Sequence, residues 1–158
     1  PFLFSRTIAE NIGIASPEMD MTAIRAAAEA AALDESITSF AQGYETMVGE
    51  RGVTLSGGQK QRAAIARMLT QETPIMIFDD SLSAVDTQTD ARIRLALSQK
   101  FGKASVILIS HRITTLSSAD QIIVLDRGRV VESGTHEELV AKKGYYHSLV
   151  QLQTGEEV

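Results

Sequence analysis

Residues 55–59 are Leu55-Ser56-Gly57-Gly58-Gln59, and they lead directly into residues 60–69, a run without Gly or Pro. The run consists of good helix formers, so we predict a helix that begins at the two glycines. The first backbone N–H groups of such a helix lie unpaired at the positive end of the helix dipole, which suits an anion. The glycines let the backbone approach a phosphate closely, and the serine hydroxyl adds a donor. A glycine-initiated helix that binds nothing is the alternative that this stretch alone leaves open.

A second group of polar residues follows two apolar runs. Residues 75–78 lead into Asp79 and Asp80, and residues 104–110 lead into His111. The first run predicts a strand buried on both faces, and the helical stretch between the runs predicts a strand–helix–strand unit with parallel strands. Ligands of open α/β sheets bind at the carboxyl ends of the strands. We therefore expect the three polar side chains to share one cleft, where a carboxylate can hold Mg²⁺. A structural or merely exposed histidine is the alternative for His111.

Shorter patterns predict the remaining elements. Asp20 precedes an Ala-rich helical stretch, and Asp34 is positioned to cap a second helix that follows it. Residues 126–128 (Asp-Arg-Gly) join two short strands as a hairpin turn. Thr135 and Glu138 form a capping box at the start of a further helix.

The composition narrows the class of protein. The chain has 158 residues, of which 44% are hydrophobic and 22% charged, as in an ordinary soluble globular protein. A net charge of −5 provides no basic surface for nucleic acid. No apolar run approaches the roughly 20 residues that cross a bilayer. The absence of cysteine excludes disulfides and thiolate metal sites. Any membrane association would therefore come through a partner or through a segment outside this chain.

The pentapeptide at residues 55–59 resembles, without a mismatch, the signature motif of the ATP-binding cassette (ABC) ATPases. The resemblance implies that its polar and glycine residues bind the γ-phosphate of an ATP held by the opposite cassette of a head-to-tail dimer. These residues are Ser56, Gly57, Gly58 and Gln59. In the same resemblance the first apolar run is a Walker B strand with Asp79 as the magnesium-side acid. His111 matches the H-loop histidine, which senses the γ-phosphate and positions the attacking water.

Two further segments acquire roles through this resemblance. Residues 81–86 resemble the D-loop, which lies along the dimer interface and here contains Ser83, Ala84 and Asp86. The segment just before the signature contains Glu50 and Arg51, which in ABC exporters would contact the coupling helices of the membrane domain. A solvated turn between glycines is the alternative for this charged pair.

The resemblance covers nearly the whole chain but only the C-terminal part of a cassette. An ATPase of this class needs a Gly-x-x-x-x-Gly-Lys-[Ser/Thr] loop to hold the phosphates. The nearest spacing is Gly52 to Gly57, and it is followed by Gly58 and Gln59 where lysine and a hydroxyl are required. We therefore expect a truncated α/β P-loop ATPase core, with a mainly parallel sheet and flanking helices, plus an α-helical subdomain. Residues 1–72 would form the helical subdomain, and residues 73–158 the second half of the RecA-like core with a C-terminal hairpin and helices.

Asp80 departs from the family pattern. The family has a catalytic glutamate there, which orients the attacking water as general base. Aspartate is one methylene shorter, which withdraws the carboxylate by roughly 1.5 Å. With an intact signature, this substitution resembles the degenerate site of heterodimeric ABC exporters, in which one cassette has a poor base but serves the competent site of its partner.

The resemblance implies an ATP-binding and ATP-hydrolysing subunit of an ABC exporter that uses ATP and Mg²⁺. Its partners would be a second cassette, most naturally in a heterodimer, and a transmembrane domain on the same full-length chain, at the cytoplasmic face of the cell membrane. We expect the isolated, soluble fragment to have no ATPase activity and to self-associate through the uncovered faces and edges of its half-built sheet. One alternative is a non-catalytic regulatory cassette. The other is a DNA-repair or chromosome ATPase, which the acidic charge and the lack of sustained heptads disfavour.

Overall fold

The computed structural model describes residues 2–16, 18, 20–49, 52–71, 73–81, 84–100 and 104–155, without the side chains of residues 99 and 100. Glu50, Arg51 and Ser83, to which the sequence assigned roles, lie outside the described residues. The chain forms two compact units, Pro1–Ile107 and Leu108–Val158. The expected division into residues 1–72 and 73–158 stays a prediction.

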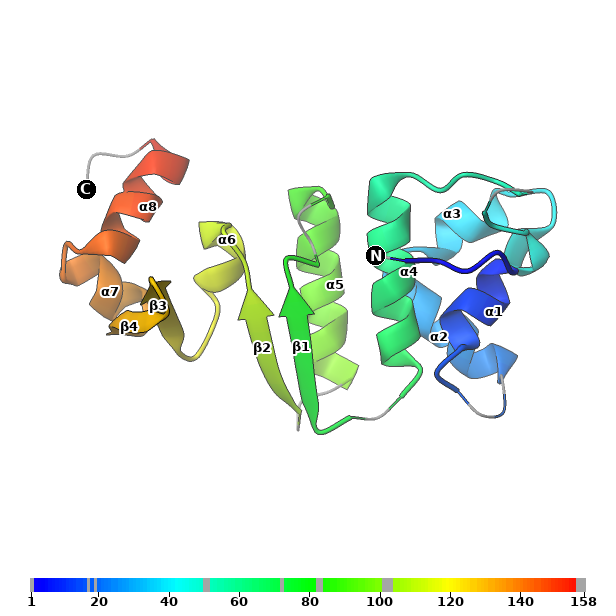
Figure 1. Ribbon diagram of the computed structural model, residues 1–158, viewed down its shortest axis with the longest axis horizontal. Coiled ribbons are helices and arrows are strands. Elements are labelled where there is room, and N and C mark those ends of the chain that lie inside the picture. The colour runs from blue at the N-terminus through cyan, green and yellow to red at the C-terminus, as the bar shows by residue number, and fades with distance from the viewer. Residues whose placement is uncertain are drawn as a thin grey trace. The chain divides into compact units, whose positions relative to one another are not determined.

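The first unit contains most of the helices (Figure 1). Its elements are α1 (Ile8–Gly13), α2 (Met21–Ala30), α3 (Asp34–Thr38), the 3₁₀ helix η1 (Gly43–Glu45), α4 (Gly57–Leu69), β1 (Ile75–Asp79) and α5 (Thr87–Lys100). Helix α4 packs on α1 and α2. Helices α2 and α4 both contribute alanines to the core that are at most 1% exposed; these are Ala27 and Ala28 of α2 and Ala63 and Ala66 of α4. The core of this unit therefore holds the helix that begins at the two glycines.

Local capping differs between two predicted helix starts. The Asp20 carboxylate accepts a hydrogen bond from Thr22 N at 2.9 Å and caps α2, as predicted. The prediction that Asp34 caps the next helix is wrong, because α3 begins at Asp34 itself, after Leu33, without a side-chain cap. The Asp34 carboxylate instead accepts a hydrogen bond of 2.6 Å from the hydroxyl of the buried Tyr44. Burial, together with this bond, raises the pKa of Tyr44 well above its ordinary value.

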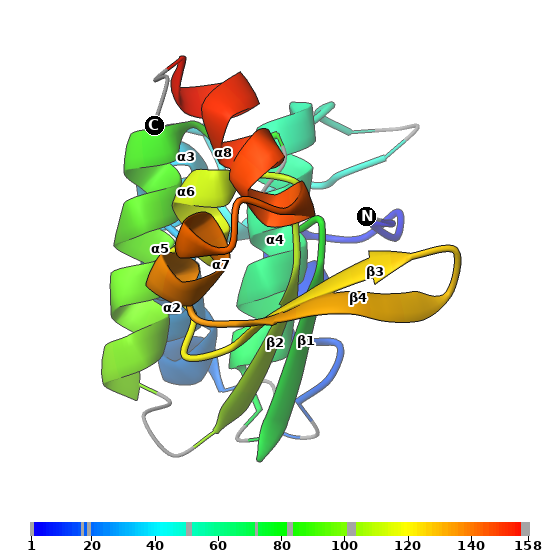
Figure 2. The same ribbon diagram turned by 90° about the vertical axis from the view of Figure 1, so that its left-hand side faces the viewer.

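Strands β1 and β2 (Ser105–Ile109) form a two-stranded sheet, and their arrows point the same way in Figures 1 and 2. This arrangement, with flanking helices, confirms the α/β fold class. The prediction that β1 is buried on both faces is wrong. Met76 and Phe78 are 1% and 3% exposed, whereas Ile75 and Ile77 are 59% and 60% exposed. One face of β1 packs on its own unit, and the alternate residues form an open apolar face.

The second unit contains α6 (Ile113–Leu116), β3 (Ile122–Asp126), β4 (Arg129–Gly134), α7 (His136–Ala141) and α8 (Tyr145–Thr154). Figure 2 shows β3 and β4 as the predicted antiparallel hairpin. Both turn residues, Arg127 and Gly128, have positive φ, of 46° and 74°, as the twist of a two-residue hairpin turn requires. The predicted capping box of Thr135 and Glu138 is also formed. A core of buried side chains joins α6, β3, α7 and α8; it consists of Ile113, Ile122, Leu139, Tyr146 and Val150.

Candidate functional site

The turn before α4 is held by a reciprocal pair of hydrogen bonds. Ser56 Oγ accepts from Gln59 N at 3.2 Å, and Gln59 Oε1 accepts from Ser56 N at 2.9 Å. This capping box fixes the first turn of the 13-residue helix Gly57–Leu69. Ser56 and Gly57 are exposed. The predicted anion site is therefore an ordered and accessible helix start.

The capping box leaves two amides for a ligand. Among the described residues, the N–H groups of Gly57 and Gly58 have no hydrogen-bond partner, whereas Lys60 N donates to Ser56 O at 2.9 Å. Because the Ser56 hydroxyl accepts from Gln59, its own hydrogen remains available to donate outward. The Gln59 side chain braces Ser56 through Oε1, whereas its Nε2 makes no hydrogen bond among the described residues.

The start of α4 also contacts Ala84, one of the residues assigned to the D-loop. Gln61 Oε1 accepts a hydrogen bond from Ala84 N at 2.9 Å. A Cβ atom on Gly58 would lie 2.8 Å from Ala84 O, whereas one on Gly57 would lie 3.9 Å from Ala84 Cβ. The absence of a side chain at Gly58 therefore lets the two segments meet. Sequence reasoning missed Gln61, since its partner lies 23 residues further along the chain.

Asp79 and Asp80 occupy the carboxyl end of β1, and both are exposed. Asp80 has a φ of 47°, in the left-handed region that aspartate tolerates better than most residues. Ser81 Oγ donates to Asp79 O at 3.3 Å and supports the turn. Exposed carboxylate oxygens are the ligands that Mg²⁺ prefers, so these residues fit a magnesium ion that is also held by substrate phosphates and water. The described residues include no cluster of three or more His, Cys, Asp or Glu side chains suited to a metal.

Asp86 has a structural partner within its own chain. Its Oδ1 accepts a hydrogen bond from Thr89 N at 2.9 Å and so caps α5. This backbone hydrogen bond holds the pKa of the Asp86 carboxyl below its usual range. The side chain is exposed, and the interface role that the resemblance gave it stays a prediction.

His111 lies in the second unit with an exposed side chain, directly after β2. Its carbonyl oxygen accepts a hydrogen bond of 2.6 Å from Gln153 Nε2. Asp79 and Asp80 belong to the first unit, so the cleft that the three side chains were expected to share stays a prediction.

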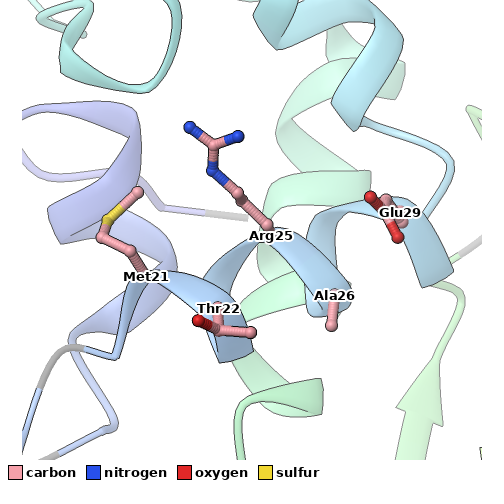
Figure 3. A pocket seen from close by; sticks show the side chains of 5 residues that line it. All are labelled: Met21, Thr22, Arg25, Ala26 and Glu29. Atoms are coloured by element: carbon pink, nitrogen blue, oxygen red, sulfur yellow. The ribbon is translucent and has the colours of Figure 1, made fainter.

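A hollow on the surface of α2 is separate from these residues (Figure 3). Met21, Thr22, Arg25, Ala26 and Glu29 line it, and all of them come from this one helix. The guanidinium of Arg25 stacks over the ring of Tyr44 at 5.3 Å from its centroid. None of the lining residues belongs to a predicted motif, so the hollow is not the candidate site.

Comparison with known proteins gives the family. The family described as "ABC transporter" matches residues 1–83, more than half of the sequence. The chain belongs to the ABC transporter family. The match includes the signature turn and the end of β1, the two segments whose geometry suits phosphate and magnesium.

Similar members of the ABC transporter family are considerably longer. The chain is 46% identical over 156 residues to "Mitochondrial potassium channel ATP-binding subunit" of Xenopus tropicalis, and covers 23% of that protein. It is 43% identical over 151 residues to "ATP-dependent lipid A-core flippase" of Chromohalobacter salexigens, and covers 26% of it. These alignments use 99% and 96% of this chain. The chain thus spans about a quarter of the length of these relatives.

A solved structure shows the same fold as this ABC transporter chain. It is described as "Structure of a bacterial Atm1-family ABC exporter with ATP bound" and is 40% identical, with a TM-score of 0.91. The match covers 99% of this chain and 27% of the other. Within the described ranges of the present chain, no helix is both long and apolar enough to span a bilayer.

Substituting the two signature glycines of the ABC transporter chain should have opposite effects on stability. Gly58→Ala forces a Cβ to within 2.8 Å of Ala84 O, so backbone must move at a cost of about 1–3 kcal/mol. Gly57→Ala makes only ordinary contacts and should gain roughly 0.5 kcal/mol from helix propensity. Thermal unfolding of the full-length protein, with hydrogen exchange at Ala84 N, measures both effects. Equal changes in the two variants would show that the contact with Ala84 does not constrain position 58.

Proposed function

We propose that this chain is part of the nucleotide-binding component of an ABC exporter, which couples ATP binding and hydrolysis in a cassette dimer to transport across a membrane. The observation that carries the proposal is the exposed, capped start of α4, where the amides of Gly57 and Gly58 remain without partners among the described residues. The names of the relatives support it, since they describe an ATP-binding subunit, a flippase and an exporter with ATP bound.

The signature turn would act on a nucleotide held by the second cassette. The two free amides and the outward hydrogen of the Ser56 hydroxyl would donate to γ-phosphate oxygens at the positive end of the α4 dipole. Because the capping box of Ser56 and Gln59 fixes these donors beforehand, little reorganisation is needed as charge develops during phosphoryl transfer.

The residues after the strands would serve the nucleotide of this chain's own cassette. Asp79 would hold Mg²⁺, which neutralises charge on the phosphates. Asp80 would orient and deprotonate the attacking water as a shortened base, and the His111 imidazole would contact the γ-phosphate. Each of these side chains is exposed in this chain and therefore accessible to a ligand.

The remaining assignments concern partners. Ser83, Ala84 and Asp86 would lie at the interface with the second cassette, most naturally in a heterodimer. Glu50 and Arg51 would contact the transmembrane domain of the same full-length chain at the cytoplasmic face of the membrane. The isolated chain would be soluble. It would have no ATPase activity, because its sequence contains no phosphate-binding loop.

A charge substitution in the signature turn tests the proposal. Gly57→Asp in the full-length dimer places a carboxylate where the partner's γ-phosphate would bind, while the helix tolerates a negative charge in its first turn. Space is available, since a Cβ at Gly57 has only a 3.9 Å contact. We expect ATP turnover at the partner's site to fall at least about 10-fold through loss of charge stabilisation. The matched neutral variant is Gly57→Asn, and equal turnover in the two variants would contradict the proposal.

A non-catalytic regulatory cassette is the second candidate, and Asp80 is the observation that favours it. In that case the signature of this chain would still serve the partner's ATP, but its own site would not turn over. The two candidates make different predictions for the rate of ATP hydrolysis when the side chain at position 80 is lengthened.

A further inference from the structure

The side-chain amide of Gln153, near the end of α8, bridges the loop that carries His111. Gln153 Nε2 donates to His111 O at 2.6 Å, and Gln153 Oε1 accepts from Ile113 N at 3.0 Å. One planar amide thus holds the chain on both sides of Arg112. Its orientation is fixed, because a flipped amide would place its oxygen against a carbonyl oxygen and its NH₂ against an N–H group.

Gln153 also satisfies a helix start that lacks a cap of its own. Arg112 is the N-cap residue of α6 and makes no side-chain capping bond. The amide of Ile113 therefore belongs to the unpaired first turn of this helix, and Gln153 supplies its acceptor. Within the loop, Ser110 Oγ accepts from Arg112 N at 3.1 Å. The loop is thus held by a hydrogen bond to its own residue Ser110 and by the two hydrogen bonds to Gln153 of α8.

Helix α8 is a firm support for this contact. Tyr146 and Val150, on the same helix, are 1% and 7% exposed and pack in the core with Ile113. The Glu132 carboxylate accepts from Tyr145 N at 2.5 Å and from Tyr146 N at 3.0 Å, and so anchors the first turn of α8. The position of Gln153 is therefore set by a packed and capped helix.

We propose that Gln153 is a positioning residue for His111. The inference rests on the proposed function, in which the imidazole of His111 contacts the γ-phosphate. That imidazole is exposed, so its place depends on the backbone of its loop, and Gln153 restrains this backbone at the His111 carbonyl itself. Misplacing a reacting group by about 1 Å can lower a rate on the order of 10²-fold. The far end of the last helix thereby helps to place the imidazole.

The test uses the full-length protein with its partner cassette, in which the partner's ATP site is inactivated so that only hydrolysis at this chain's own site is measured, and compares Gln153→Ala with Gln151→Ala. Gln151 lies on the same helix, and for the described residues its side chain makes no hydrogen bond. We expect Gln153→Ala to lower kcat for ATP hydrolysis about 10-fold with KM changed less than about twofold, because loop position affects the reacting geometry more than ATP binding. Gln151→Ala should match the wild type in both.

The variant Gln153→Glu distinguishes two roles of Gln153, the positioning of the His111 loop and the capping of α6. Glutamate still accepts from Ile113 N but cannot donate to the His111 carbonyl when ionised. Its second carboxylate oxygen would face the His111 carbonyl oxygen, so we expect a small loss of thermal stability with a kcat reduced at least as far as in Gln153→Ala. Wild-type kcat in Gln153→Glu would overturn the inference, since it would show that only the capping of α6 matters. This variant also decides the question if Gln153→Ala does not fold.

A double substitution distinguishes this inference from the proposed function. His111→Ala should lower turnover, and adding Gln153→Ala should lower it no further, since the two residues act as one unit. If His111→Ala leaves turnover unchanged, the role proposed for His111 fails. If His111→Ala is impaired while Gln153→Ala behaves like Gln151→Ala, the inference about Gln153 alone is overturned.

Discussion

Replacing Asp80 with glutamate in the full-length dimer should raise ATP turnover at this chain's own site by up to about 100-fold. The added methylene advances the carboxylate by roughly 1.5 Å, and an error of about 1 Å in placing a reacting group can cost on the order of 10²-fold. Asp80 is exposed, so the longer side chain has room. Turnover is measured with the partner's site inactivated, so that hydrolysis at this site is observed alone.

The gain in rate should carry a small loss of stability. Asp80 has a φ of 47°, where aspartate is tolerated because its short side chain can hydrogen-bond locally, and glutamate should cost roughly 1 kcal/mol more. Asp80→Asn keeps the shape suited to this backbone and removes the base, so it is the matched control and should show no turnover at the site. If Asp80→Glu leaves turnover as low as Asp80→Asn, the base does not limit the site, and the non-catalytic regulatory cassette becomes the better description.

Elements whose determinants are local could be predicted from the sequence. The start of α4 follows from Ser56 and the glycines after it, because a capping box needs only four consecutive residues. The β3–β4 turn follows from Arg127 and Gly128, whose positive φ values suit a two-residue hairpin. The signature motif could be found for the same reason: its chemistry and its helix start occupy one short segment.

Contacts between distant residues could not be predicted. Gln61 meets Ala84 across 23 residues, and Gln153 meets His111 across 42, and a flexible polar side chain has no periodicity that indicates its partner. The exposed face of β1 could not be predicted for a related reason. Its apolar run predicts a strand correctly, but burial on both faces was wrong, because the run does not indicate which element covers each face.

Removing the side chain of Asn11 should destabilise the N-terminal segment and its contact with α4 by about 3 kcal/mol. Asn11 is 1% exposed, and its Oδ1 accepts from Phe4 N at 2.8 Å and from an Arg67 guanidinium nitrogen at 3.3 Å. Its Nδ2 donates to Phe4 O and Thr7 O, both at 3.0 Å. Asn11→Ala leaves several of these groups unpaired, at about 1–3 kcal/mol for each that stays buried. The Arg67 bond connects this network to α4, the signature helix.

Hydrogen exchange in the full-length protein measures this effect locally. The amide of Ile8, which donates to Thr46 O at 3.0 Å, should lose protection by roughly 100-fold in Asn11→Ala, since every 1.4 kcal/mol is about tenfold. Asn11→Asp keeps the acceptor contacts but turns a buried carboxylate oxygen toward the carbonyls of Phe4 and Thr7, so its loss of protection should be at least as large as in Asn11→Ala. The neighbouring control is Glu10→Ala, which removes a single capping bond to Thr7 N at 2.9 Å and should cost about 1 kcal/mol. If Asn11→Ala costs no more than this control, the buried amide does not hold α1 to the signature helix, and the apolar contacts between the two helices alone must do so.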